Sequence, residues 1–256
     1  MKIFKTNRVL EKARLFIFTF VIIFINGCRS APEIIQKDYE YEKMVFDNHR
    51  FTFEIHLENI KNSKKASGLI NKLIYKNNTF DEYILFKEKE FIGDIEKEDF
   101  PPMIDDDGTE YFYHSDLIEK YNIEYYNDLF IIIKYSDWAY YTGAAHGNYG
   151  FNYFIVDLTD EKILGIDELF YPIPDTLLKE TIKKIYDEAY LRIYDRKESI
   201  WPPDTISLQK DSVILLWNIY SITPYALGHV EINIDNKIVN PYLTEKGRKI
   251  IKSMNK

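Results

Sequence analysis

The sequence predicts an α+β fold, made mainly of antiparallel sheet with one or two packed helices, behind a short N-terminal signal segment. Three observations lead to this prediction. Strand-like segments come in groups before and after helical segments, without a regular β-α-β alternation. Aromatic residues, which favour strands, are abundant, with 21 Tyr and 17 Phe among 256 residues. A short apolar stretch near the N-terminus ends at the one cysteine of the chain.

The N-terminus has the parts of a secretion signal. Five basic residues flank the start of the apolar stretch Leu15–Ile25, which is shorter than the ~20 residues that a membrane-spanning helix needs. The stretch ends in Asn26, Gly27 and Cys28, and a cysteine directly after a small residue resembles the processing site of bacterial lipoproteins. We expect residues 1–27 to be a lipoprotein signal peptide and Cys28 to carry the lipid. An uncleaved anchor with an incidental cysteine is the alternative.

Either interpretation places the body of the protein outside the cytoplasm. It would be lipid-anchored to the cell membrane or the outer membrane and would face the periplasm or the exterior. Loss of residues 1–27 removes five basic residues and one acidic residue, so 28 basic residues would face 40 acidic ones. This acidic body argues against nucleic acid as a partner. It is compatible with a cationic protein partner and equally with simple solubility.

The first half of the mature chain is predicted to hold a hairpin and a helical region. Residues 28–41 are expected to be the lipidated cysteine and a tether, and residues 43–48 and 50–58 to be strands. Phe51, Phe53 and Ile55 alternate with polar residues, a period of two with one solvated face. Apolar spacing predicts helix over 64–92, and a loop is expected over 96–109.

The second half is predicted to return to strands. Segments 123–135, 137–141 and 149–157 have strand character, and a turn over 158–162 leads to a short strand and a helical turn. A helix is expected from Pro174-Asp175 onwards, followed by strands at 206–208, 212–217 and 230–234. We expect an N-terminal subdomain over 42–157, a C-terminal subdomain over 158–243 and a charged tail over 244–256.

Two segments have an unusual composition for connecting loops. They are Tyr141-Thr142-Gly143-Ala144-Ala145-His146-Gly147 and Pro224-Tyr225-Ala226-Leu227-Gly228. Together with Ile166–Phe170, they resemble the paired domains of unknown function in the extracellular part of lysozyme-sensing anti-sigma factors. The same pair forms the non-catalytic N-terminal half of some peptidoglycan deacetylases. The resemblance covers roughly residues 42–243 and implies a secreted or membrane-tethered α+β module.

The resemblance also implies a binding habit, because the anti-sigma branch binds lysozyme through this domain. Pro224 and Tyr225 are the positions that it marks as partner-binding candidates, and the aromatic side chains of Tyr141 and Trp138 are added from the sequence. The N-terminus has neither the cytoplasmic segment nor the spanning helix of that branch, so a sigma-regulating role is not expected. We expect a binding module for a lysozyme-like muramidase, another cationic protein or a cell-wall fragment.

No coherent catalytic set is visible, and neither a catalytic residue nor a cofactor is expected. The five histidines lack zinc-site spacing, and Asp105-Asp106-Asp107-Gly108 lacks the ligand series of a calcium loop. Gly143, His146, Gly147 and Gly228 are expected to shape turns. The alternative function is a cell-wall-directed hydrolase, with His146 and His229 meeting near Asp137.

Overall fold

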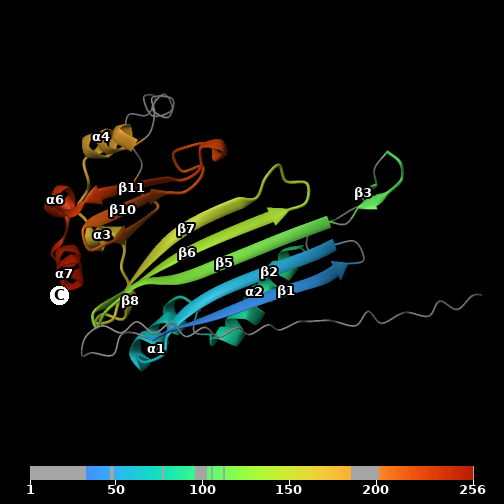
Figure 1. Cartoon of the computed structure of the whole chain (residues 1–256), viewed down its shortest axis with the longest axis horizontal. Coiled ribbons are helices and arrows are strands. Elements are labelled where there is room, and N and C mark those ends of the chain that lie inside the picture. Colours follow the sequence, from blue (N-terminus) through green and yellow to red (C-terminus); the bar gives the residue numbers. More distant parts are fainter. Residues whose placement is uncertain are drawn as a thin grey trace, which may run out of the picture.

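The computed structural model describes residues 33–46, 49–76, 78–95, 103–104, 106–111, 113–185 and 202–255. It has the predicted α+β fold, with a large and a small sheet and helices packed on both (Figure 1). The expected signal peptide, Cys28 and residues 29–32 lie outside the described residues. Within the described part, no helix is both long and apolar enough to cross a membrane.

The large sheet has six strands in the order β1-β2-β5-β6-β7-β8. Their bounds are β1 (Ile34–Phe46), β2 (His49–Ile60), β5 (Tyr113–Tyr126), β6 (Phe130–Tyr141), β7 (Asn148–Asp157) and β8 (Lys162–Ile163). Neighbouring strands are antiparallel except for β2 and β5, which are parallel. A parallel pair needs a crossover, and α1 (Lys64–Leu73) and α2 (Phe80–Ile95) lie in that connection. The helix predicted over 64–92 is therefore confirmed as two helices.

One face of this sheet packs against α1 and α2. The side chains of Phe51, Phe53 and Ile55 are buried there, while Glu54 and His56 point to the other face. Ser63 caps α1 by accepting a hydrogen bond from the backbone N–H of Ala66 at 3.2 Å. The alternation that predicted this strand thus decides which face the helices cover.

The small sheet has three antiparallel strands in the order β11-β10-β9. They are β9 (Thr205–Leu208), β10 (Ser212–Trp217) and β11 (Val230–Asp235), and the helices near them are α3 (Ile166–Leu169), α4 (Asp175–Ile185), α6 (Asn236–Val239) and α7 (Glu245–Met254). Two 3-10 turns, η1 (Tyr225–Leu227) and η2 (Asn240–Tyr242), complete this part. Figure 1 shows these elements gathered at one end of the large sheet.

Strands β6 and β7 take part in both hydrophobic cores. Ile131 and Ile133 belong to the core under α1 and α2, whereas Phe130 and Ile132 belong to the core with the small sheet. The β7–β8 turn, where the boundary between subdomains was expected, is thus part of a sheet that both cores share. The short hairpin of β3 (Met103–Ile104) and β4 (Glu110–Tyr111) extends from the opposite end (Figure 1).

The tether prediction is wrong for residues 34–41, because β1 begins at Ile34. Ile34, Tyr39 and Tyr41 pack against the core of α1 and α2. Charged residues alternate with these apolar residues, and the sequence alone therefore does not identify this segment as an edge strand.

The predicted strands 123–135 and 137–141 have the wrong boundaries. The turn lies at Asn127, whose side-chain oxygen accepts hydrogen bonds from the backbone N–H groups of Leu129 and Phe130 at 2.9 and 3.0 Å. This is an Asx turn, and it separates β5 from β6. Strand β5 also begins ten residues earlier than predicted, at Tyr113.

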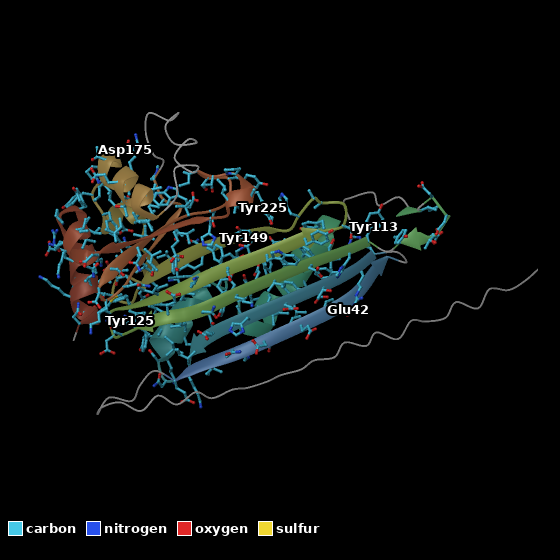
Figure 2. The ribbon with its side chains drawn as sticks, turned by 45° about the horizontal axis from the view of Figure 1, so that its top comes forward. Glu42, Tyr113, Tyr125, Tyr149, Asp175 and Tyr225 are labelled. Atoms are coloured by element: carbon cyan, nitrogen blue, oxygen red, sulfur yellow. The ribbon has the colours of Figure 1, made fainter. Side chains whose placement is uncertain are left out.

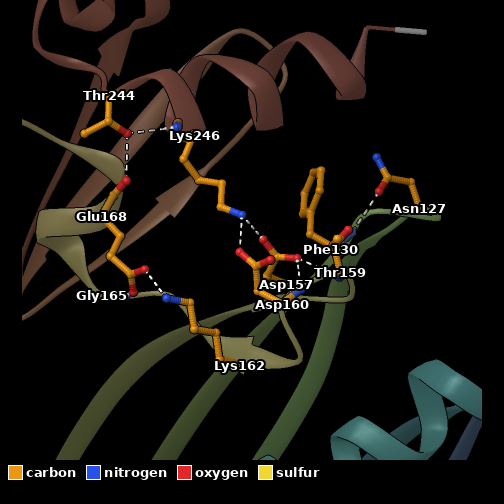
Figure 3. Close-up of polar contacts among 11 residues, drawn as sticks. Asn127, Phe130, Asp157, Thr159, Asp160, Lys162, Gly165, Glu168, Thr244 and Lys246 are labelled. Carbon is orange, nitrogen blue, oxygen red and sulfur yellow. Dashed lines mark hydrogen bonds and ion pairs between the residues drawn. The ribbon is translucent and has the colours of Figure 1, made fainter.

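The charged tail predicted over 244–256 is wrong for residues 245–254, which form the helix α7. Thr244 caps it by accepting from the backbone N–H of Gly247 at 3.1 Å, and Ile250, Ile251 and Met254 are buried. Lys246 of this helix forms ion pairs with Asp157 at the end of β7 and with Asp160 in the β7–β8 turn (Figure 3). Charge at the exposed positions hides the apolar face of this helix in the sequence.

Candidate functional site

The two loop segments that carry the family resemblance meet in space. The imidazole of His146, in the β6–β7 turn, stacks on the ring of Tyr225 in η1 with centroids 3.4 Å apart and planes at 14°. The hydroxyl of Tyr220 lies 3.4 Å from Nε2 of His146. His146 and Pro224 are exposed. The contact therefore lies on the surface, where the two sheets adjoin.

Backbone and side-chain bonds hold the β6–β7 turn in shape. Thr142 donates its N–H to the carbonyl of His114 at 2.8 Å, and its hydroxyl accepts from the N–H of His114 at 2.5 Å. Gly143 has a φ of +91°, which favours glycine. Gly147 passes close to an indole, since a Cβ at this position would lie 2.6 Å from Nε1 of Trp138. Both glycines thus give the turn a path that leads His146 to Tyr225.

Hydrogen bonds inside the loop before β11 fix the shape of that loop. The hydroxyl of Thr223 donates to the carbonyl of Gly228 at 2.7 Å, and the N–H of Gly228 donates to the carbonyl of Tyr225 at 2.9 Å. Gly228 has a φ of +75°, and a Cβ there would lie 3.2 Å from the hydroxyl of Tyr149. These bonds present Pro224 and Tyr225 on the outside of a closed loop.

Further aromatic side chains connect this contact to β7. Tyr149 lies edge-on to Tyr225 with centroids 5.9 Å apart, and His229 is tilted against Phe151 at 4.7 Å. Figure 2 shows Tyr149 and Tyr225 close together. We call the whole group the aromatic cluster, and its members are His146, Tyr149, Phe151, Tyr220, Tyr225 and His229.

An amide side chain docks the small sheet on the free edge of β7. Asn218 accepts from the N–H of Phe151 at 2.8 Å and donates to its carbonyl at 3.0 Å. Two residues along β7, the N–H of Tyr153 donates to the hydroxyl of Thr205 at 2.9 Å. Side chains thus replace the neighbouring strand here, and they fix the position of the loop that carries Tyr225.

The remaining partner-binding candidates lie on different faces. Trp138 stacks on Tyr140 at 6.2 Å, on the face of the large sheet away from α1 and α2. Tyr141, which is 39% exposed, contacts Phe91 of α2 at 5.8 Å. Trp138 thus shares a face with the aromatic cluster, and Tyr141 does not.

The geometry does not support the hydrolase alternative, because the side chain of Asp137 points to the face of the large sheet that α1 and α2 cover. Burial raises the pKa of its carboxyl, and the charge of Glu119 raises it further. His146 and His229 both join the aromatic cluster, with Asp137 on the other side of the sheet. These three residues do not form one site.

A buried polar cluster under α2 has no counterpart among the predicted sites. Glu119 is 3% exposed, and Nζ of Lys87 lies 2.9 Å from its Oε1. The hydroxyls of Tyr83 and Tyr135 each lie 3.4 Å from this carboxylate. Burial, followed by the charge of Glu119, raises the pKa of Tyr83 to about 12. Because Lys87 and Glu119 are far apart in the sequence, no spacing signals their contact.

Two histidine–aspartate pairs lie on the face opposite to that cluster. Nδ1 of His56 lies 2.5 Å from Oδ1 of Asp38, and Nε2 of His114 lies 2.7 Å from Oδ1 of Asp116. In the described part of the chain, no group of three or more His, Cys, Asp or Glu side chains is placed to hold a metal ion. The side chains of both pairs are part-exposed, at 20–42%.

The fold and this surface define an α+β protein with a six-stranded and a three-stranded sheet, at whose junction lies a part-exposed aromatic cluster. Residues 167–237 match the family DUF3298, described as a protein of unknown function, so the chain carries a DUF3298 domain over that stretch. A search of the curated proteins found no match.

The solved structures that are similar to this chain include two crystal structures of DUF3298 family proteins. A crystal structure of a DUF3298 family member from Bacteroides fragilis has a TM-score of 0.64 and 21% identity, over 88% of this chain and 97% of that chain. A DUF3298 family protein from Pseudomonas aeruginosa has a TM-score of 0.54 and 17% identity, over 84% of this chain and 95% of that chain. At these identities the likeness shows the fold alone.

Proposed function

We propose that this protein is a lipid-anchored binding module of the bacterial cell envelope, and that the aromatic cluster is part of its ligand surface. The observation that carries the proposal is the stacking of His146 on Tyr225 at 3.4 Å. It brings two distant loop segments together on the surface and leaves Pro224 exposed beside them. Tyrosine is enriched at binding surfaces because it offers a large apolar area with a polar end.

A lysozyme-like muramidase is the partner that we propose first. The resemblance of the two loop segments to the extracellular domain of lysozyme-sensing anti-sigma factors motivates it. The acidic composition of the chain, with a net charge of −8, suits a cationic partner. A cell-wall fragment is the second ligand of the same envelope class.

Calorimetry of the full-length chain in detergent with lysozyme, at low and at physiological salt, tests the partner. We expect binding that Tyr225→Ala weakens at least about tenfold, as for a central interface residue. Tyr171→Ala is the control, because Tyr171 is an exposed tyrosine outside the aromatic cluster, between α3 and α4. Absence of heat in both buffers removes lysozyme as a partner, and equal effects of the two variants remove the aromatic cluster as its site.

Membrane anchoring is a separate part of the proposal and rests on the sequence around Cys28. In a bacterial host, the full-length chain should take up labelled palmitate and sediment with the membranes. Cys28→Ala should abolish the label. A wild-type chain that sediments with the membranes but takes up no label would point to the uncleaved anchor instead.

A further inference from the structure

Over β1, β2 and β5, no described element covers the face of the large sheet that points away from α1 and α2. We call this surface the open face. Its side chains alternate with the buried ones of the same strands, and Glu54 and Ile118 on it are part-exposed. The small sheet packs on this face further along, over β6 and β7. Figure 1 shows β1 and β2 extending away from the small sheet.

The open face has an excess of negative charge. Its cations are Lys120 and Arg50, and Arg50 lies 2.8 Å from the carboxylate of Glu42. Its acidic residues are Asp38, Glu40, Glu42, Glu54, Glu58 and Asp116. Glu40 and Glu54 are directly opposite each other in the β1–β2 register. Like charges in this arrangement destabilise a sheet, so the pair has a cost that a bound cation would remove.

A groove of about 510 Å³ lies at this pair of carboxylates. Its lining on the open face includes Asp38, Glu40, Glu54, His56, Ile118 and Lys120. Ile118 gives the groove an apolar floor beside the carboxylates. An apolar floor next to negative charge suits a side chain with an aliphatic stem and a cationic end, as in lysine and arginine.

The strand registers place this groove in one row with the aromatic cluster. Glu40 is opposite Glu54, Glu54 opposite Ile118, Ile118 opposite Trp138, and Trp138 opposite Tyr149. Side chains paired in this way point to the same face of a sheet. Five strands at ~4.8 Å spacing span about 19 Å, which is the length of about six extended residues.

We propose that the open face binds a segment rich in lysine and arginine from a cationic protein. The segment crosses the strands along this row. One cationic end group lies between Glu40 and Glu54, its stem covers Ile118, and a second cation lies over the ring of Trp138. This inference rests on the proposed function, and it adds where the partner binds and what it must present.

The test uses the full-length chain in detergent and a hexa-arginine peptide, with binding measured at about 20 and 150 mM salt. The test variant replaces both glutamates (Glu40→Gln with Glu54→Gln). The control variant, Glu180→Gln with Glu245→Gln, removes the same charge from exposed positions on α4 and α7. We expect the test variant to lose about tenfold in affinity at low salt and less at high salt, because salt screens exposed charges. The control should lose less than about twofold.

A second measurement separates binding from damage to the fold. The thermal midpoint of the test variant should rise, because two opposed like charges are gone. A fall in the midpoint together with the affinity loss would mean that the carboxylates support the fold, and would overturn the inference.

Further outcomes separate this inference from the proposed function. If the wild type binds lysozyme and the test variant binds it equally well, the inference is wrong and the proposed function stands. If the wild type binds hexa-arginine through the two glutamates and does not bind lysozyme, the inference stands and lysozyme is excluded. Binding of a chitin oligomer that is lost in Trp138→Ala and kept in the test variant would overturn the inference in favour of a neutral glycan.

Discussion

Replacing Lys246 by methionine should weaken the attachment of α7 to the large sheet. Nζ of Lys246 forms ion pairs with Asp157 and, at 2.7 Å, with Asp160 (Figure 3). Side-chain exposure is 7% for Asp157 and 29% for Lys246. Methionine keeps much of the aliphatic stem and removes the charge, so the change isolates the ion pairs.

The expected loss follows from this partial burial. Removing one partner of a fully buried ion pair costs about 3–5 kcal/mol, because the other charge stays buried alone. Asp157 would keep two hydrogen bonds, from the N–H groups of Thr159 at 2.7 Å and Asp160 at 3.0 Å. With these bonds retained, we expect a loss of ~2 kcal/mol, which is roughly the strength of a hydrogen bond to a charged group.

Urea unfolding of the full-length chain followed by circular dichroism measures this loss. Lys249→Met is the control, because Lys249 is exposed on the same helix. It should change the free energy of unfolding by less than about 0.5 kcal/mol. Equal stabilities of the two variants would refute the ion pairs as the attachment of α7.

The pH dependence gives an independent check. Burial alone would raise the pKa of Asp157, but Lys246 and the N–H groups of Asp160 and Thr159 together hold it below its ordinary value. A lowered pKa contributes stability above the ordinary value, near 4, and this contribution is lost as the pH falls through the folded-state pKa. The deficit of Lys246→Met should therefore be largest near neutral pH and should shrink as the pH falls below about 4.

Three further predictions concern the two faces of the large sheet. Gly147→Ala should lower stability by about 1–3 kcal/mol and shift tryptophan fluorescence, because its Cβ would lie 2.6 Å from Nε1 of Trp138; unchanged melting and emission would contradict this. Burial and the charge of Glu119 raise the pKa of Tyr83 to about 12, so its neutral hydroxyl contributes stability that is complete below pH ~10 and is lost as the pH rises through about 12. Tyr83→Phe should therefore make the free energy of unfolding fall less steeply with pH in this alkaline range. Glu119→Gln should cost about 1–3 kcal/mol, because Lys87 would lose the buried one of its two acidic partners and keep the exposed Glu90. Adding Lys87→Met should recover part of this loss in a double-mutant cycle.

The strands differ in how well the sequence predicts them, and burial explains the difference. Strand β2 can be predicted from the sequence because its buried side is apolar, with Phe51 and Phe53, and its other side is polar. The first part of β5 cannot be predicted in this way, since the polar residues Ser115 and Glu119 are on its buried side. Glu119 can be buried there because Lys87 of α2 neutralises it, and this contact depends on tertiary structure.

The candidate site was predictable in composition and not in arrangement. His146 and Tyr225 stand out in the sequence by their glycine-rich surroundings. Their stacking requires the small sheet to dock on β7, and Asn218 supplies the bonds to Phe151 that fix this docking. The sequence does not show that this asparagine, which precedes a turn, makes the backbone hydrogen bonds that a neighbouring strand would make. The groove at Glu40 and Glu54 likewise depends on the β1–β2 register.

The layout of the cores explains how an open face with opposed charges can persist. Stability comes from apolar packing of the large sheet against α1 and α2 on one side, and against the small sheet on part of the other. The open face has no packing role, so a like-charge pair such as Glu40 and Glu54 costs only the ~0.2–1 kcal/mol of an exposed cross-strand pair. A fold stabilised by two cores tolerates that cost easily. Where the small sheet ends, the same face passes from core to solvent, and Trp138 and Tyr149 lie at this transition. A partner that binds along the row would therefore contact a strand-borne surface, and at Glu40 and Glu54 the recognising side chains take no part in the packing of either core.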